Sequence, residues 1–436
     1  MVNFICSKCE KEFKQKGHYE RHLARVRSCT NKKVQPPSTS SIQPLEGLTF
    51  IDLFCGIGGF HIALSNLGAK CLLACDIDEK CRAIYKTNTG LEPKSDIKEL
   101  KSEEIPAFDI LCGGFPCQAF SHAGRQGGFE DTRGTLFREI ARILKDKQPK
   151  YFLLENVKNL KGHDGGKTLS IIYKSLQDVG YLTQEPIVLS PHHLGVPQHR
   201  ERVFLLGIRK DLVTSPFKPF PALPTQKTNL STILESGDIS KSLCLSKSDT
   251  EVLDLWEEFL QFFKEKQIKL PTFPIWSEDW DSTYSLTDLP EWKQKFIQQN
   301  RQFYKENQQF LDEWLLKART NLHFTGARTK FEWQCGSFQP NDSLWTNLFT
   351  FRPSGIRVKR ANYSPALVAM AQIVYIGSQK RKLSPREVAR LQSFPDSFQV
   401  HPSMSVAYKQ FGNSVNVDVV KRMTTYLVTE MLPTAP

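Results

Sequence analysis

Apolar positions in the middle of the chain follow two different periods. Short, nearly continuous apolar runs predict buried strands, and the segments between them place apolar residues three or four positions apart, which predicts amphipathic helices. The expected strands are residues 48–56, 70–78, 108–114, 151–157 and 202–208, and the expected helices are residues 59–68, 79–88, 135–146 and 167–180. Strands and helices that alternate in this order predict an α/β fold built on a doubly wound parallel sheet.

This alternation occupies only part of the chain. A stretch rich in Pro, Ser and Thr precedes it and predicts an extended linker, and a Pro-rich region with a helical insertion at about residues 250–320 follows it. Near the end of the chain the α/β character returns and is expected to rejoin the first core. The expected parts are a small domain at residues 1–33, the linker at 34–46, the α/β domain at 47–212, a separate domain at 213–370 and a carboxy-terminal segment at 371–436.

The charge of the chain favours a polyanionic partner. It holds 58 Lys and Arg against 46 Asp and Glu, a net charge of +12, and residues 1–45 alone contribute nine basic against three acidic side chains. A concentrated basic region of this kind favours nucleic acid. No apolar run approaches the roughly 20 residues of a membrane span, so we expect a soluble intracellular protein. Its eleven cysteines are then expected to be thiols, metal ligands or a catalytic group rather than disulfides.

Cysteine and histidine recur near the amino terminus at the spacing of a zinc site. Cys6 and Cys9 are separated by two residues, His22 follows after twelve more and Cys29 after a further six. A domain this short can hardly fold without metal. The segment resembles a zinc finger with two cysteines and two histidines, with Cys29 in place of the last histidine at a longer spacing than usual. Cys29 is therefore the least secure ligand.

The alternative to the finger is a basic tail with incidental cysteines. If the finger reads DNA, the helix positions that would meet base edges are Gln15, His18 and Arg21. A single finger can equally bind only phosphates or contact another protein.

A glycine turn marks a ligand pocket at the start of the α/β domain. The motif "FIDLFCGIGGF" is a strand that enters a glycine turn and then a helix, and the free amides of such a helix favour a carboxylate or phosphate. A plain tight turn gives the same pattern. Asp76 ends the second strand, where it could accept hydrogen bonds from a ribose, and Asp96 with Ile97 offers a polar edge and an apolar face to an adenine. Each acid alone is more commonly a cap or a turn residue.

The stretch "FDILCGGFPCQAFS" places Cys117 directly after Pro116, beyond the end of a predicted strand. Ligands of doubly wound sheets bind at the carboxyl ends of the strands. Cys117 can be a buried packing residue or a nucleophile, and the pattern alone leaves both open.

Together, the motifs of this chain resemble those of the DNA cytosine-5 methyltransferases. The similarity covers about residues 48–210 and 380–425 and rests on an ordered series: "FIDLFCGIGGF", "DILCGGFPCQAFS", "FEDTRGTLF", "LLENV", "GVPQHRERVFLLG", "SPREVARLQSFPD" and "QFGNSV". The resemblance implies an S-adenosylmethionine-dependent methyltransferase (Rossmann-like) sheet at 47–212, a smaller target-recognition domain at 213–370, and a carboxy-terminal segment that packs against the cofactor domain.

The resemblance also implies roles for the catalytic residues. The Cys117 thiolate would add to C6 of cytosine and make C5 nucleophilic. Glu155 would protonate or hydrogen-bond N3, which requires a pKa raised by burial. Arg202 would contact the cytosine O2, and Arg200 would support the loop or the nucleophile. Because a stacked base is out of reach, the target must be flipped out, and residues 118–134 would form the loop that closes over it.

For the cofactor, the resemblance implies that Asp76 holds the ribose and that the remaining contacts come from Phe54, Gly56, Ile57, Gly59, Asp96, Ile97, Pro116, Leu136, Asn413, Ser414 and Val415. In the expected recognition domain, the basic segment "FRPSGIRVKR" is the best candidate for groove and phosphate contacts; its cations are Arg352, Arg357, Lys359 and Arg360. A solvated basic hairpin is the alternative for this segment.

The leading hypothesis is an enzyme that methylates C5 of cytosine in a specific double-stranded DNA sequence. It is expected to be a monomer in the bacterial cytoplasm and to protect host DNA from a cognate restriction endonuclease without a stable complex. One alternative is the same chemistry on transfer RNA, which the long recognition region and the finger disfavour. Another is a zinc-finger DNA-binding regulator on an inactive methyltransferase core, which the intact Cys117, Glu155 and Arg202 disfavour.

Overall fold

The computed structural model describes residues 43–116, 135–237, 239–367 and 372–432, together with residues 4–5, 12–13, 15 and 20. The chain divides into two compact units, Met1–Gln43 and Pro44–Pro436, and each is described separately. In the first unit, strands β1 (Phe4–Ile5) and β2 (Glu12–Phe13) pair antiparallel, with Phe4 opposite Phe13. The predicted zinc ligands Cys6, Cys9, His22 and Cys29 lie outside the described residues.

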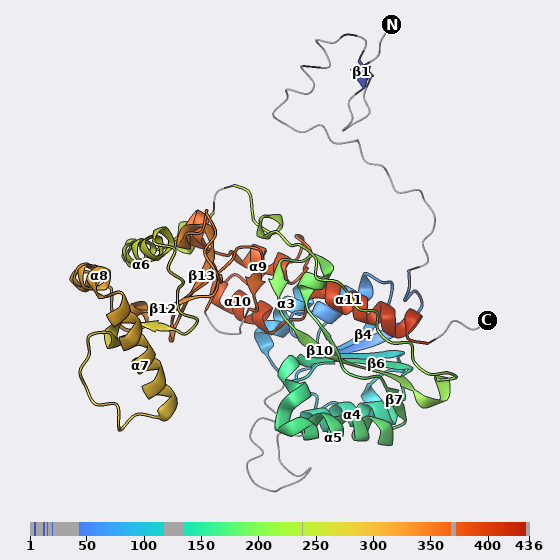
Figure 1. Ribbon diagram of the computed structural model, residues 1–436. Coiled ribbons are helices and arrows are strands. Elements are labelled where there is room, and N and C mark those ends of the chain that lie inside the picture. Colours follow the sequence, from blue (N-terminus) through green and yellow to red (C-terminus); the bar gives the residue numbers. More distant parts are fainter. Residues whose placement is uncertain are drawn as a thin grey trace. The chain divides into compact units, whose positions relative to one another are not determined.

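The second unit is built around a seven-stranded sheet with strand order β4-β3-β5-β6-β10-β7, in which β8 also pairs with β10 (Figure 1). The bounds of its strands are β3 Thr49–Leu53, β4 Lys70–Cys75, β5 Ile110–Gly114, β6 Tyr151–Val157, β7 Tyr181–Thr183, β8 Ile187–Leu189 and β10 Arg202–Arg209. The five predicted strands therefore all occur, and β7 and β8 are additional.

The expectation of a wholly parallel sheet is wrong at β10. Strands β3 to β6 are parallel, but β10 runs antiparallel to β6, β7 and β8. The chain reaches β10 from β8 through a short 3₁₀ turn at Pro191–Leu194 and the two-residue strand β9 (Gln198–His199). A parallel neighbour needs a crossover that packs on the sheet, usually a helix, so this connection turns the chain back as a hairpin would. The sheet is consequently mixed.

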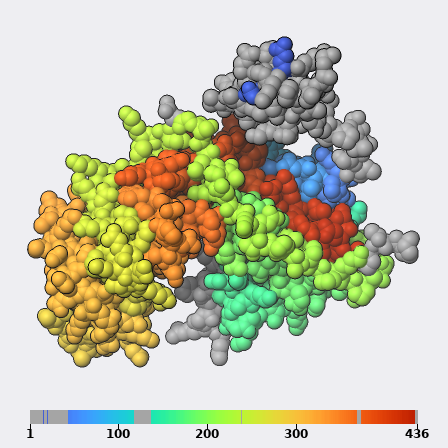
Figure 2. All heavy atoms as spheres, turned by 45° about the horizontal axis from the view of Figure 1, so that its top comes forward, coloured from blue at the N-terminus to red at the C-terminus, as the bar shows by residue number. Residues whose placement is uncertain are grey.

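Helices cover both faces of this sheet. Helices α4 (Thr135–Lys147) and α5 (Lys167–Asp178) bury their apolar sides in one core cluster. The other core cluster contains side chains of α2 (Gly59–Ser65), α3 (Glu79–Thr89) and α11 (Val417–Thr425). Helix α11 packs directly on α2, so the carboxy-terminal segment contributes to the first core. In Figure 2 red residues of the carboxy-terminal segment accordingly lie beside blue and green residues from the first half of the chain.

A second sheet of six strands follows, with the order β11-β12-β14-β13-β16-β17. Its strands are β11 Ile275–Trp276, β12 Lys330–Trp333, β13 Leu348–Arg352, β14 Gly355–Lys359, β16 Tyr375–Ile376 and β17 Arg381–Lys382, so it continues past residue 370. The expected helical insertion consists of α6 (Lys247–Glu265), α7 (Glu291–Glu306) and α8 (Gln308–Thr320). These helices share an aromatic core with the sheet, in which Trp256 stacks on Phe331.

Along β13 and β14 the side chains alternate between two environments. Phe349, Ile356 and Val358 are buried in the aromatic core, and the intervening polar residues occupy the opposite face. The remaining described elements are β15 (Ser364–Pro365), α9 (Pro385–Leu391) and α10 (Met404–Asn413). Among the helices that the structure describes, none combines the length and the apolar character of a transmembrane helix.

Candidate active site

The end of β5 lies directly beside Glu155. Gly114, the last residue of β5, is opposite Glu155 in the parallel pairing of β5 with β6. The side-chain amide of Asn156 donates to the carbonyl of Phe115 over 2.9 Å and so fixes the chain as it leaves the sheet. Pro116 is exposed, and Cys117 and the loop to residue 134 lie outside the described residues. The segment that leads to Cys117 therefore starts next to Glu155.

Glu155 and Arg202 form a buried ion pair. The Nε of Arg202 lies 3.0 Å from Oε1 of Glu155, and their side chains are 19% and 11% exposed. Burial raises the pKa of Glu155 above its ordinary value, and the charges of Arg202 and Arg200 oppose this shift without cancelling it. A carboxyl group in this environment can hold a proton to higher pH than a solvated glutamate and can still be oriented by the arginine.

Arg200 has a different environment from Arg202. Its side chain is buried and donates to the carbonyls of Leu367, Gly412 and Ser414 over 2.9, 2.9 and 2.8 Å. Burial lowers the pKa of its guanidinium, and the charge of Arg202 adds to this effect. Arg200 therefore joins the loop before β10 to two distant segments, which is the geometry of a positioning residue.

The glycine turn between β3 and α2 is closed by Asp76. Phe54 and Gly56 adopt left-handed backbone angles, with φ of 55° and 53°. The amide of Gly56 donates to one carboxylate oxygen of Asp76 and the amide of Asp78 donates to the other, each over 2.8 Å. Asp76 is thus a turn-closing acid, and each of its oxygens retains a lone pair for a further donor.

The predicted residues from the far end of the chain reach this turn. A Cβ atom at Gly59 would lie 2.6 Å from Cγ2 of Val415 and 3.1 Å from Oγ of Ser414, so only glycine allows this approach. Ser414 and Val415 are buried, and Asn413 is exposed at the end of α10. The structure therefore brings Gly59, Ser414 and Val415 together across more than 350 residues of sequence.

The other predicted cofactor residues have different environments from one another. Asp96 accepts a hydrogen bond from the amide of Lys98 over 2.9 Å and so caps its own turn. Ile57 and Ile97 are buried in the core, and Leu136 packs against it from α4. These buried apolar side chains can form only the wall of a pocket.

Ile77 is the residue that sequence reasoning missed at this site. It lies between Asp76 and Asp78 after the end of β4, and 77% of it is exposed, next to the acid that closes the glycine turn. The available signal was the motif "DID", in which an apolar residue between two acids ends a buried strand.

Asp52 lies below the turn on β3 and is completely buried. Burial, with a smaller contribution from the charge of Asp76, raises its pKa well above the ordinary value, and neither carboxylate oxygen makes a hydrogen bond of normal geometry with the described residues. The part of the chain that the structure describes contains no group of three His, Cys, Asp or Glu side chains that could hold a metal ion.

Comparison with known proteins shows which family the chain belongs to. Residues 48–429 match the family model of the C-5 cytosine-specific DNA methylases. The chain belongs to this family. Similar proteins include the type II methyltransferases M.HpaII of Haemophilus parainfluenzae, 35% identical over 89% of this chain and 90% of the relative, and M.HhaI of Haemophilus parahaemolyticus, 33% identical over 86% and 93%. M.AluI of Cellulosimicrobium cellulans is 32% identical over 86% and 91%.

A solved structure supports the fold. The crystal structure of a mutant of Spodoptera frugiperda DNMT2 covers 87% of this chain and 99% of its own, with 20% identity and a TM-score of 0.50. The expected α/β methyltransferase fold is confirmed, as is the type of enzyme: the protein is a DNA (cytosine-5)-methyltransferase of an S-adenosylmethionine-dependent family.

The described residues fit this cofactor. The backbone at Gly56 has open space beside it, Asp76 retains acceptor capacity and Ile77 offers an exposed apolar surface at the same edge of the sheet.

Proposed function

We propose that this enzyme methylates C5 of a flipped-out cytosine in a specific double-stranded DNA sequence through a covalent adduct with Cys117. The observation that carries the proposal is the buried Glu155, whose pKa is raised while Arg202 holds it beside the strand that leads to Cys117. The similar proteins are named type II methyltransferases, which supports a role within a restriction-modification system. We expect the enzyme to protect bacterial DNA from an endonuclease with the same recognition sequence, without a stable complex.

In the proposed reaction, the Cys117 thiolate adds to C6 of the cytosine ring. Glu155 donates a proton or a hydrogen bond to N3 as negative charge develops on the ring, and Arg202 contacts O2 and orients Glu155. The resulting enamine is nucleophilic at C5. Bound S-adenosylmethionine would supply the electrophilic methyl group and would leave as the neutral thioether S-adenosylhomocysteine. Loss of the C5 proton then restores the double bond and expels Cys117 as a thiolate, and water held in the site is our candidate for the base.

The residues proposed to hold S-adenosylmethionine come from four places in the fold. The turn from Phe54 to Gly59 and the segment Asn413–Val415 would enclose the methionine part, and Asp76 would reach the ribose with the lone pairs that its amide contacts leave free. We add Ile77 as an apolar contact for the adenine, with Asp96 at the polar edge. Pro116 and Leu136 complete the proposed pocket.

For the first unit we propose a zinc finger with ligands Cys6, Cys9, His22 and Cys29. The antiparallel pairing of β1 with β2 supports this, because Cys6 and Cys9 fall between the two strands in the sequence, as the finger would require. The finger would strengthen binding to DNA through its basic charge.

The second sheet is our candidate for target recognition. The helical insertion at residues 247–320 holds 14 acidic against 10 basic side chains, so its net charge of −4 disfavours contact with DNA. The basic segment on β13 and β14, residues 351–360, has four basic and no acidic side chains.

The experiment that tests the proposal is expression in a host without cytosine methylation, followed by bisulfite sequencing of its DNA. We expect one sequence motif to be methylated at one cytosine throughout. The variant Cys117→Ser should abolish methylation and retain binding of both DNA and S-adenosylmethionine. Unmodified DNA with modified transfer RNA would instead establish the RNA substrate, and full activity of Cys117→Ser would remove Cys117 from the mechanism.

A further inference from the structure

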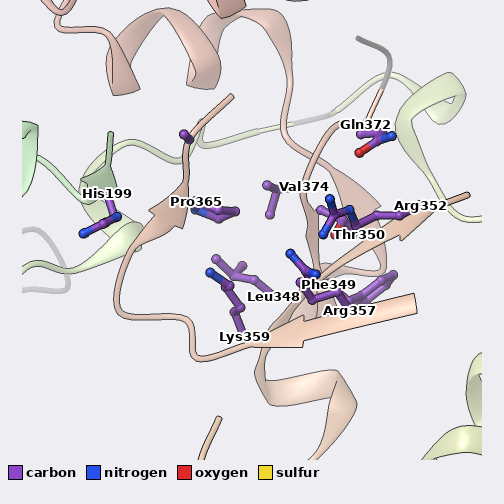
Figure 3. Close-up of a pocket in the computed structure, with 11 residues that line it drawn as sticks. His199, Leu348, Phe349, Thr350, Arg352, Arg357, Lys359, Pro365, Gln372 and Val374 are labelled. Atoms are coloured by element: carbon purple, nitrogen blue, oxygen red, sulfur yellow. The ribbon is translucent and has the colours of Figure 1, made fainter. Parts of the chain in front are cut away.

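The polar face of β13 and β14 lines a pocket of about 310 Å³. Figure 3 shows His199 on one side of this pocket and side chains from the two strands on the other. We call it the cationic pocket and define it by the polar residues His199, Thr350, Arg352, Arg357, Lys359 and Gln372. No role in the proposed chemistry uses it.

Arg357 is held in one orientation within this pocket. It lies opposite Glu332 of the neighbouring strand β12, and its Nε donates to Oε2 of Glu332 over 2.6 Å. Its two terminal amino groups have no hydrogen-bond partner among the residues that the structure describes. A guanidinium fixed at Nε presents these two groups as a planar, parallel pair of donors, so little entropy is lost when they bind two acceptors.

Arg352 and Lys359 surround Arg357 without acidic partners of their own in the described chain. All three cations line the same pocket, and burial, with the charge of Arg357 as a smaller cause, lowers the pKa of Arg352 and of Lys359. Glu332 neutralises one of the three charges. The pocket therefore favours a ligand rich in acceptors or negative charge.

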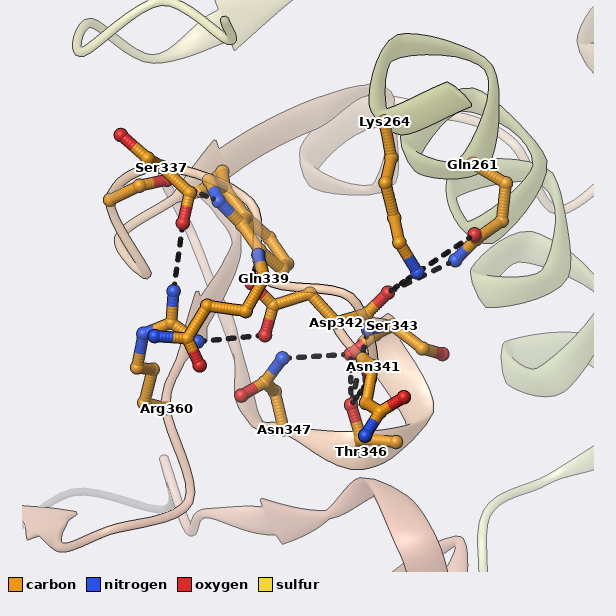
Figure 4. A network of polar contacts seen from close by, with 12 residues as sticks. Gln261, Lys264, Ser337, Gln339, Asn341, Asp342, Ser343, Thr346, Asn347 and Arg360 are labelled. Carbon is orange, nitrogen blue, oxygen red and sulfur yellow. Dashed lines mark hydrogen bonds and ion pairs between the residues drawn. The ribbon is translucent and has the colours of Figure 1, made fainter. Parts of the chain in front are cut away.

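The fourth cation of the basic segment is not available in the same way. Arg360 donates to Oδ1 of Asp342 over 2.7 Å and to the carbonyl of Ser337 over 2.9 Å, within the internal network shown in Figure 4. Asp342 in turn connects through its carbonyl to Lys264 of α6. Arg360 thus stabilises the second sheet, and the pocket keeps Arg352, Arg357 and Lys359.

The wall of the pocket is fixed to the loop before β10, which carries Arg200. Pro365 pairs with His199 in the short parallel pairing of β15 with β9, and the amide of Ser364 donates to the carbonyl of Pro197 over 2.8 Å. Arg200, the residue after His199, bonds the carbonyl of Leu367. The wall that contains His199 and Pro365 is therefore joined to the segment that carries Arg200 and Arg202.

We propose that Arg357 reads a guanine in the recognition sequence of this enzyme and that Arg352 and Lys359 bind the neighbouring phosphates. This inference rests on the proposed function. In the major groove, guanine presents two acceptors, O6 and N7, on one edge, and a bidentate arginine matches them. Phosphate oxygens offer the same acceptor chemistry without sequence information, so the experiment must separate the two sources.

The experiment starts from the methylated motif of the wild-type enzyme, determined by bisulfite sequencing. Methylation kinetics are then measured on a set of duplexes in which each guanine of the motif in turn is replaced by 7-deazaguanine, which lacks the N7 acceptor. The wild type should lose activity at one guanine position. Arg357→Ala should lower kcat/KM on the unmodified duplex about 10-fold to 100-fold and should no longer respond to the substitution at that position.

Matched variants separate base reading from phosphate binding. Lys359→Ala should weaken binding to all duplexes alike and reduce the dependence of affinity on salt by about one counterion. Glu332→Gln should keep the charge of Arg357 and reduce only its discrimination between guanine and 7-deazaguanine. Lys330→Ala, on the same sheet but outside the pocket, is the control and should change neither property.

An Arg357→Ala enzyme that weakens on all duplexes equally, with a smaller salt dependence, would make Arg357 a phosphate contact and overturn the proposal. If that variant does not fold, as judged by circular dichroism, Arg357→Lys retains the charge without the fork and must still lose the response to 7-deazaguanine. A wild-type enzyme that methylates no DNA would contradict the proposed function before any variant is tested, so the two failures are distinguishable.

Discussion

At the scale of single residues, the protonation state of Glu155 is central to the proposed chemistry. Its burial favours the neutral acid, and the nearby Arg202 and Arg200 favour the carboxylate; burial is the larger effect, and the pKa is raised. The acid form can donate a proton to N3 of cytosine, and the carboxylate form cannot. The arginine is therefore useful only if it orients the carboxyl group without removing its proton.

We predict that Glu155→Gln lowers the single-turnover rate of methyl transfer by about 10²-fold to 10⁴-fold, because the amide can donate a hydrogen bond but no proton. In the wild type the rate should fall as pH rises through the raised pKa of Glu155, since the acid is lost there, and Glu155→Gln should lack this limb. The measurement is rapid-quench kinetics across pH on a duplex substrate. Glu201→Gln, which alters a neighbouring carboxylate paired with Lys158, is the control. A pH limb that persists in Glu155→Gln would assign it to another group.

At the scale of elements, the sequence predicts where strands occur better than how they run. The apolar run from Arg202 to Ile208 reads as a buried strand in either direction, and only its hairpin return from β8 makes it antiparallel. Strands β7 and β8 have three residues each, which is too short for a periodic signal.

In the candidate site, too, the local sequence predicts the elements better than the contacts between distant ones. The contact of Gly59 with Ser414 and Val415 was expected only because the motifs resembled a known family, since nothing local links positions so far apart. The pairing of Arg357 with Glu332 was not predicted at all. It depends on the register of β12 with β14, and a parallel register between strands that are not consecutive leaves no pattern in the sequence.

Gly59 gives a prediction at this scale, because it is where α2 meets the carboxy-terminal segment. Gly59→Ala should weaken binding of S-adenosylmethionine about 10-fold, since the new methyl group would lie 2.6 Å from Cγ2 of Val415 and force the two elements apart. Adding Val415→Ala should recover part of the affinity. Gly162→Ala is the control, because nothing lies within 4 Å of a Cβ there. Isothermal titration calorimetry measures the affinities, and an unchanged affinity in Gly59→Ala would separate this joint from the cofactor site.

At the scale of the whole molecule, the net charge and the proposed sequence recognition belong to different parts of the chain. Residues 1–45 supply half of the net charge of +12, and the helical insertion is acidic. The cationic pocket lies in the second unit, together with Glu155 and Arg202. A basic unit that does not include the sheet proposed for recognition can raise affinity for any DNA without altering which sequence is read.

We therefore predict that removal of the proposed zinc ion from the enzyme weakens its DNA binding but leaves the methylated motif unchanged. The double variant Cys6→Ser, Cys9→Ser should do the same and bind one zinc ion fewer per chain, because a four-ligand site cannot hold the metal without its cysteine pair. Cys244→Ser, at an exposed cysteine of the second unit, should retain zinc and affinity. Zinc content by mass spectrometry, binding at several salt concentrations and bisulfite sequencing provide the three measurements. A change in the methylated motif on loss of zinc would place base reading in the finger, and equal zinc content in the double variant and the wild type would exclude the proposed ligands.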